Sequence, residues 1–287
     1  MSMAPGALDA QHPTGLVRWE DVNRDPLAAD IRVWYGADSL MFGDLRIPPG
    51  MPHPPLVVVI HGGCWRAEND LRHASHLSAA LRDVGIATWT IEYRRVGNSG
   101  GGWPGTFKDI VAAVNHVQAL APDHGLEVDR VTVLGHSAGA QLALWLAAYA
   151  GSSVEKFGIQ SVDVAIASVV ALAPITDLRA FSEGVEYCNR AVAPYLGGTP
   201  EVVPERFAFA SPMELPIAPM PIYLVHGERD PHVPPSQSRA YRNAAAASGR
   251  TVTLEIIAEA GHFDLVAPSS LTWPQVLGII RSAVSSR

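Results

Sequence analysis

The chain has 287 residues, of which 48% are hydrophobic and 17% charged, and its formal net charge is −7. This composition is typical of a globular protein, and an acidic chain without a run of Lys or Arg excludes nucleic acid as an expected partner. The sequence contains no apolar run of about 18 residues, so we expect neither a spanning helix nor a membrane partner.

Residues 1–14 lack a basic start followed by an apolar run, so we expect no secretory signal and a cytoplasmic protein. The two cysteines, Cys64 and Cys188, stand in neither a C-x-x-C nor a C-x-x-H spacing. We interpret both as free thiols, although two cysteines can also pair in an oxidising compartment. No metal or cofactor is expected.

Strand patterns and helix patterns alternate along the chain. Two short pieces, 31–35 (IRVWY) and 40–47 (LMFGDLRI), are joined by a turn and predict an antiparallel edge. The continuous apolar run 56–60 (LVVVI) is typical of a central parallel strand that is buried on both faces. Further strands are expected at 86–93, 130–134, 164–172, 222–226 and 252–258, and helices at 72–84, 104–120, 138–149, 236–247 and 274–283.

This alternation predicts an α/β fold. We expect one domain over 1–287, built on a mostly parallel, doubly wound sheet of eight strands with helices on both faces. The ligand site of such a sheet lies at the carboxyl ends of its strands. Residues 177–221 have no strand pattern and are rich in Pro, Gly and aromatic residues, so we interpret them as an insertion that forms a candidate lid.

Residues 135–139 read GHSAG, a G-x-S-x-G pattern between the expected strand 130–134 and the expected helix 138–149. A tight turn from strand to helix exposes a serine oxygen and aims it at a base, and the flanking glycines let that turn close. We therefore predict that Ser137 is a nucleophile.

A serine nucleophile needs an imidazole as its base and a carboxylate that orients the imidazole. His262 follows the strand 252–258 in EAGHF, and Asp230 follows the strand 222–226 in HGERDP. The order Ser137, Asp230, His262 is the one used by triads on sheets of this kind. Glu228 and Asp177 are the competing carboxylates and stay open as alternatives.

The segment 61–65 (HGGCW) follows the central strand 56–60. Backbone N–H groups at this place stabilise the oxyanion of a tetrahedral intermediate, together with the N–H of the residue after the nucleophile. We assign Gly63, Cys64 and Ala138 as the donors of this oxyanion hole. An ordinary Gly-Gly turn after a strand is the alternative interpretation.

The segments HGGCW, GHSAGA, HGERDPHVP and GHF together resemble the α/β-hydrolase superfamily, from about residue 31 to the end. Within it, the HGG segment with Trp65, the GHSAGA segment, Tyr93-Arg94 and His262-Phe263 resemble the arylformamidase (kynurenine formamidase) and small carboxylesterase group. The resemblance implies the α/β-hydrolase fold and a Ser-His-Asp triad. It leaves the substrate open among aryl formamides, carboxylic esters and acetylated sugars.

We expect a serine hydrolase that cleaves carboxylic esters with small acyl or aryl groups, with arylformamidase activity as the alternative. A non-catalytic ligand-binding protein, or a lyase or C–C bond hydrolase with the same triad, is also compatible with the fold. Whether the protein is a monomer or a homo-oligomer stays open. Aromatic residues near the expected mouth could line a substrate pocket or pack in the core, namely Trp65, Trp103, Phe181, Tyr187 and Tyr195.

Overall fold

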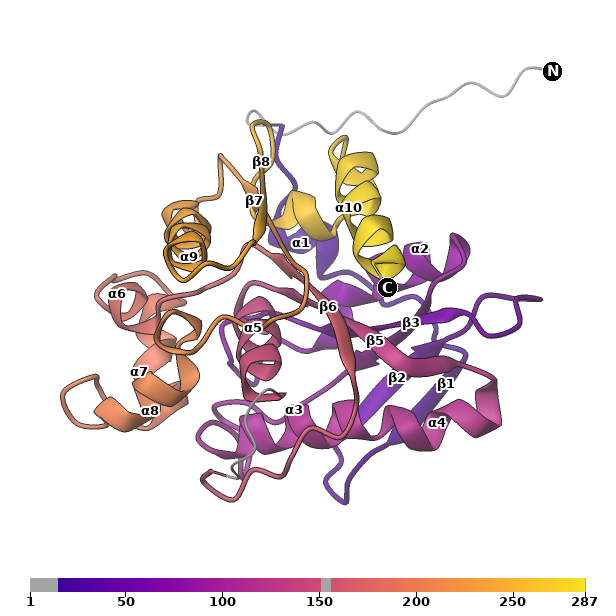
Figure 1. Ribbon diagram of the computed structural model, residues 1–287, viewed down its shortest axis with the longest axis horizontal. Helices are drawn as coiled ribbons and strands as arrows, with labels where there is room; N and C mark the ends of the chain where they lie inside the picture. Colours follow the sequence, from indigo (N-terminus) through magenta and orange to yellow (C-terminus); the bar gives the residue numbers. More distant parts are fainter. Residues whose placement is uncertain (1–14, 151–155, 287) are drawn as a thin grey trace.

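The computed structural model describes residues 15–150 and 156–286. Residues 1–14, on which the expectation about a secretory signal rests, lie outside this described part. One eight-stranded sheet runs through the molecule, in the spatial order β1-β2-β4-β3-β5-β6-β7-β8 (Figure 1). Its strands are β1 (Ile31–Trp34), β2 (Phe42–Arg46), β3 (Pro55–Ile60), β4 (Ala87–Ile91), β5 (Glu127–His136), β6 (Ile166–Leu172), β7 (Ile222–Gly227) and β8 (Thr253–Ile257).

The sheet is parallel except at one end. Strand β2 runs antiparallel to both β1 and β4, and the pairs from β4 through β3, β5, β6 and β7 to β8 are parallel. The prediction of a mostly parallel sheet of eight strands with an antiparallel edge is confirmed. The carboxyl ends of β3, β5, β7 and β8 therefore lead to the loops that carry the predicted site.

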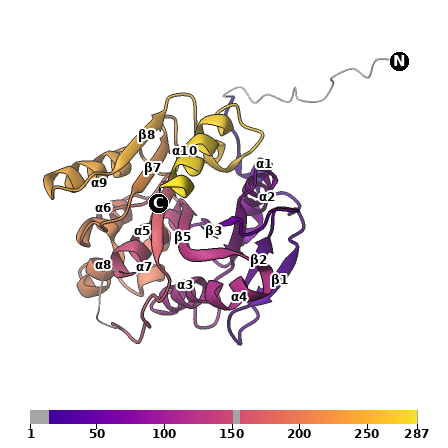
Figure 2. The same cartoon turned by 45° about the vertical axis from the view of Figure 1, so that its right-hand side comes forward.

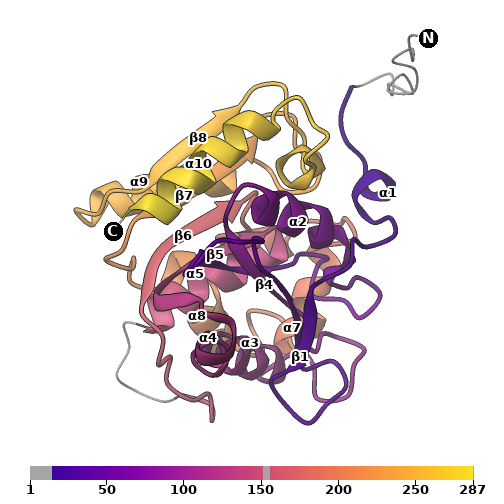
Figure 3. The same ribbon diagram turned by 90° about the vertical axis from the view of Figure 1, so that its right-hand side faces the viewer.

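Helices cover both faces of the sheet, with α2 and α10 on one side and α3, α4 and α5 on the other (Figure 3). The pattern over 104–120 forms two helices rather than one, and they meet at His116. The short helix α1 has no counterpart in the prediction from sequence. The helices are α1 (Trp19–Val22), α2 (Ser75–Asp83), α3 (Gly105–Asn115), α4 (Val117–His124), α5 (Ala138–Ala150), α6 (Leu178–Ser182), α7 (Val192–Leu196), α8 (Pro204–Ala210), α9 (Ser236–Ala247) and α10 (Trp273–Ser285).

Strand β3 explains why the central strands are apolar at every position. Val58 packs into the core beneath α3 and α5, whereas Val57 and Val59 pack into the core beneath α2 and α10. Because both faces of the strand are covered, each side chain is buried whichever way it points. The sheet thereby becomes a rigid support for the loops at its ends.

The insertion 177–221 forms α6, α7 and α8, which lie together beside α5 (Figures 1 and 2). It contains no strand, as its sequence predicted. Its apolar side chains join the core on the α5 face: Phe181, Tyr195 and Phe207 are at most 3% exposed. The insertion is therefore part of the folded body as well as a cover for the strand ends.

Candidate active site

Ser137 lies in a strained turn between β5 and α5. Its φ is +56°, in the left-handed region that side chains other than glycine rarely adopt. A Cβ on Gly135 would lie 2.2 Å from the carbonyl oxygen of Gly139, so the turn can close only with glycine there. The backbone N–H of Ser137 donates to the carbonyl of Leu172 (2.8 Å) and ties the turn to β6. The sequence thus places this serine at the carboxyl end of β5, as predicted.

His262 and Asp230 meet in the loops that follow β8 and β7. The distance from His262 Nδ1 to Asp230 Oδ2 is 2.6 Å, and the Asp230 side chain is fully buried. The other carboxylate oxygen accepts the N–H groups of His232 (2.8 Å) and Val233 (2.9 Å). Because the carboxylate can only accept, Nδ1 carries the proton and Nε2 presents its lone pair.

The surroundings of Asp230 keep it ionised. Burial raises the pKa of Asp230, but the charge of His262 and hydrogen bonds from His226, His262 and the Val233 N–H outweigh burial and hold this pKa well below its usual range. The imidazole of His226, 3.4 Å away, is held by the Ser238 hydroxyl and the Val233 carbonyl. The acid is therefore a fixed negative charge beside the imidazole.

The two competing carboxylates have other partners. Glu228 forms an ion pair with Arg239. Asp177 caps α6, because its side chain accepts the N–H of Ala180 at 3.1 Å. Of the three candidates, Asp230 is the carboxylate in contact with His262.

The HGG loop after β3 presents unpaired backbone donors. Gly63 and Cys64 both have positive φ, of 103° and 55°, and Asn69 holds the loop through its bond to the Gly63 carbonyl (2.9 Å). The N–H of Gly62 donates to His73 Nε2 (3.3 Å), whereas those of Gly63 and Cys64 make no hydrogen bond within the described chain. Ala138 is the first residue of α5, where an N–H has no intrahelical acceptor.

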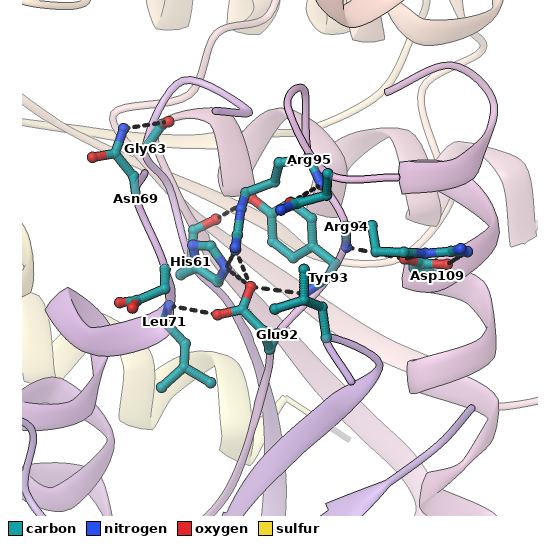
Figure 4. A network of polar contacts seen from close by, with 12 residues as sticks. His61, Gly63, Asn69, Leu71, Glu92, Tyr93, Arg94, Arg95 and Asp109 are labelled. Atoms are coloured by element: carbon teal, nitrogen blue, oxygen red, sulfur yellow. Dashed lines mark hydrogen bonds and ion pairs between the residues drawn. The ribbon is translucent and has the colours of Figure 1, made fainter. Parts of the chain in front are cut away.

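A buried network supports this loop from below (Figure 4). The Glu92 carboxylate forms an ion pair with Arg95 and accepts the N–H of Leu71 at 3.1 Å. The Tyr93 hydroxyl donates to the His61 carbonyl (2.8 Å). The His61 Nδ1 lies 2.8 Å from the Gly62 carbonyl oxygen, and its Nε2 lies 3.0 Å from Arg95 Nη1 and 3.1 Å from Glu92 Oε1.

Three neutral imidazoles lie side by side behind the site. Ring centroids are 5.9 Å apart for His61 and His73, 5.6 Å for His73 and His136, and 4.6 Å for His136 and His262. Burial lowers the pKa of His61 and of His73 to about 3, and lowers that of His136 well below 6.5. His136 Nε2 also donates to the His262 carbonyl (3.2 Å), so the histidine inside GHSAG holds the loop of the predicted base.

A pocket of about 520 Å³ opens at these strand ends. Ser137, His262, Gly63 and Cys64 line it, together with Tyr187 of the insertion. Sequence reasoning missed other lining residues. No sequence signal marked Trp19 or Glu186, whereas His136, His232 and Phe263 stood inside the motifs GHSAGA, HGERDPHVP and GHF. The further lining residues are Trp19, Asn69, His73, His136, Glu186, Cys188, Pro231, His232 and Phe263.

The other four predicted aromatic residues do not line this pocket. Trp65 and Tyr195 are fully buried and stack on each other, with centroids 4.6 Å apart. Phe181 is 3% exposed in the same core, and Trp103 packs edge-on against Phe107 at 5.3 Å. For these four, the alternative interpretation as packing residues holds, because three are buried in the core on the α5 face and Trp103 is partly buried against it.

The interpretation of both cysteines as free thiols is wrong. Cys64 of the HGG loop and Cys188 of the insertion form a disulfide, with their Cα atoms 5.0 Å apart. The packing of the insertion onto the loop brings together two residues that are distant in the chain. The bond joins the predicted oxyanion hole to the wall of the pocket, and it removes free thiols as an argument for a reducing compartment.

The described residues contain neither a candidate metal site nor a candidate membrane-spanning helix. Within 15–150 and 156–286, no group of three or more His, Cys, Asp or Glu side chains could hold a metal ion. No helix in this part of the chain is long and apolar enough to cross a bilayer.

The order and direction of the strands define the α/β-hydrolase fold. Esterase B from Lactobacillus Rhamnosis (HN001) has the same fold, with a TM-score of 0.75 and 22% identity over 90% of this chain and 87% of that one. A truncated carbohydrate esterase from gut microbiota gives a TM-score of 0.73 at 20% identity, over 91% and 100%.

The family BD-FAE matches residues 44–244, and the chain belongs to this family. Esterase LipQ of Mycobacterium tuberculosis (strain ATCC 25618 / H37Rv) is 29% identical over 225 residues, which cover 74% of this chain and 51% of the relative. Esterase LipC of the same organism is 26% identical over 243 residues, covering 82% and 60%. The chain therefore spans about half the length of these curated relatives. The resemblance to the arylformamidase group stays a prediction.

We predict that the Cys64–Cys188 disulfide stabilises the fold, because it closes a loop with a sequence separation of 124. Replacing Cys188 by Ala should lower the free energy of unfolding by about 2–4 kcal/mol. Urea unfolding of the air-oxidised wild type and of the variant, each with and without dithiothreitol, measures the effect. Two thiols that react with Ellman's reagent in the unfolded, air-oxidised wild type would restore the free-thiol interpretation.

We also predict that stability falls on mild acidification. The folded-state pKa values of His61, His73 and His136 lie below the unfolded value, so the unfolded chain binds more protons as the pH falls below about 6.5. His61 and His73 should each cost up to about 1.4 kcal/mol per pH unit in that range, down to about pH 3, and His136 adds a cost of the same sign. Urea unfolding at pH 7.5, 6.5 and 5.5 gives the slope of the unfolding free energy against pH. The control is the His53→Asn variant, which removes an exposed histidine and should keep the wild-type slope. A flat profile between pH 6.5 and 5.5 would contradict it.

Proposed function

We propose that this protein is a serine hydrolase that cleaves carboxylic esters through Ser137, His262 and Asp230. The observation that carries the proposal is the 2.6 Å contact between His262 Nδ1 and Asp230, in a pocket that Ser137 also lines. The membership in the BD-FAE family and the esterase names of LipQ and LipC support it. The unpaired N–H groups of Gly63 and Cys64 give the same pocket a place for an oxyanion.

The reaction follows from these positions. His262 Nε2 accepts the proton of the Ser137 hydroxyl while the serine oxygen attacks the ester carbonyl. Asp230 stabilises the imidazolium that forms, and the N–H groups of Gly63, Cys64 and Ala138 donate to the oxyanion. The proton then passes from His262 to the leaving alcohol. Water repeats the sequence on the acyl enzyme and releases the acid.

The pocket supports a substrate of modest size. A volume of about 520 Å³ lies in the lower half of the range of ligand pockets, and Trp19, Tyr187 and Phe263 give it aromatic surface. We therefore propose small acyl or aryl esters as substrates. Hydrolysis of aryl formamides would use the same serine and the same oxyanion donors, so one assay can compare the two.

We predict that Ser137→Ala and His262→Ala each lower kcat by about a thousandfold or more on p-nitrophenyl acetate, because each removes a group that acts directly on the reacting atoms. Initial rates on this ester, p-nitrophenyl octanoate and N-formylkynurenine compare acyl length and formamide cleavage. Circular dichroism checks that the variants fold. A variant rate within about tenfold of the wild type would contradict the roles of Ser137 and His262.

The choice of acid has its own prediction. Asp230→Asn should lower kcat by about a hundredfold to ten-thousandfold, since the amide favours the wrong imidazole tautomer. Glu228→Gln and Asp177→Asn are matched controls, because their carboxylates pair with Arg239 and cap α6. Both should stay within a few-fold of wild type on p-nitrophenyl acetate. If either control loses more activity than Asp230→Asn, the acid is misassigned.

A further inference from the structure

The insertion forms one wall of the pocket with Glu186, Tyr187 and Cys188. This segment is anchored to the HGG loop and its surroundings. Cys188 is bonded to Cys64, and the Tyr187 hydroxyl donates to Glu68 Oε1 at 2.6 Å. Glu186 directly precedes these two anchored residues, and its backbone N–H donates to Asn189 Oδ1 (3.1 Å), although residues 183–187 are exposed.

Glu186 gives the pocket an unpaired negative charge. Among the described residues that line this pocket, it is the one member of the Asp, Glu, Lys and Arg set. Its carboxylate makes no hydrogen bond or ion pair within the described part of the chain. A carboxylate beside a pocket that lacks a lining cation attracts positive groups and repels negative ones.

The imidazoles of the pocket do not cancel this charge. Burial lowers the pKa of His73 to about 3, and lowers the pKa values of His136 and His232 below the usual value. These three rings are accordingly neutral at neutral pH. His262, whether neutral or protonated, stands against the buried carboxylate of Asp230, so this pair adds no net positive charge.

Two opposite charges flank Tyr187 outside the pocket. The Arg66 guanidinium lies 4.5 Å from the ring centroid of Tyr187, and the Glu68 carboxylate lies 2.6 Å from its hydroxyl. These two opposite charges flank the same side chain. Arg190, whose backbone N–H donates to the Glu186 carbonyl (3.1 Å), does not line the pocket, and within the described residues it forms no ion pair with Glu186. Glu186 is therefore the charged side chain that this wall presents to the pocket.

We propose that Glu186 determines specificity by charge, favouring esters whose alcohol part is cationic and disfavouring substrates that carry a carboxylate. The inference rests on the proposed ester hydrolysis and adds a substrate class to it. A substrate carboxylate, such as that of an N-formylated amino acid, would find no lining Lys or Arg to pair with. A cationic alcohol would pair with Glu186 without displacing an existing partner. Because Glu186 is exposed, solvent and salt weaken the attraction.

Acetylcholine and 3,3-dimethylbutyl acetate have nearly the same shape but differ in charge, so comparing them measures the effect of a cationic alcohol part. For the wild type at low salt, kcat/KM should be about threefold to tenfold higher for the cationic ester, which is the size expected of a partly screened charge pair. Glu186→Gln should bring this ratio to about one and leave kcat/KM for the neutral ester within about twofold. Glu183→Gln, the same charge change at an exposed position of the same insertion, should leave the ratio unchanged.

A wild-type ratio at or below one, or a ratio that survives Glu186→Gln, overturns the inference while ester hydrolysis stands. If neither ester is turned over, their inhibition constants against p-nitrophenyl acetate hydrolysis replace kcat/KM, and equal constants overturn it. No Ser137-dependent turnover of p-nitrophenyl acetate would instead remove the proposed function itself.

Discussion

The carboxyl ends of β3 and β5 approach each other so closely that side chains do not fit between them. A Cβ on Gly139 would lie 2.2 Å from the carbonyl oxygen of Ile60, and one on Gly62 would lie 2.7 Å from that of His136. Glycine is required at such contacts because any Cβ would overlap the neighbouring backbone. The approach brings the HGG loop against the turn of Ser137. This close backbone approach therefore fixes two places together: the place where a nucleophile would attack and the place where an oxyanion would be held.

Such a loop needs support from below, and buried charges provide it. The Glu92 carboxylate binds Arg95 and accepts backbone N–H groups, while Tyr93 holds the His61 carbonyl. Burial lowers the pKa of Arg95 to about 10, which leaves the guanidinium charged at neutral pH. Burying an ion pair costs desolvation energy, and the hydrogen bonds to the remaining carboxylate lone pairs offset that cost. The network's contribution is the placement of the loop, since none of these four side chains lines the pocket.

The sheet and the polar turns could be predicted because local sequence determines them. Continuous apolar runs mark strands buried on both faces, and the segment 135–139 carries its glycines next to such a run. The positions of Asp230 and His262 followed from strand ends that meet at one edge of a parallel sheet. The pairing of Cys64 with Cys188 could not be predicted, because spacing in the chain says nothing about how an insertion packs. Whether these side chains act together in catalysis stays a prediction.

The packing of the insertion could not be predicted from sequence either, and this packing determines whether the insertion can open as a lid. Large aromatic side chains suit a core and a pocket equally, so sequence could not separate Tyr187 at the pocket from Tyr195 in the core. Tyr195 of the insertion stacks on Trp65 of the HGG segment, and Phe181 of the insertion is buried in the same core. Lifting the insertion as a unit would expose these rings to water, at roughly 1.5–3 kcal/mol for each. Within the insertion, we therefore expect any opening movement in the exposed segment 183–187, and the bond from Cys188 to the HGG loop limits how far that segment can move.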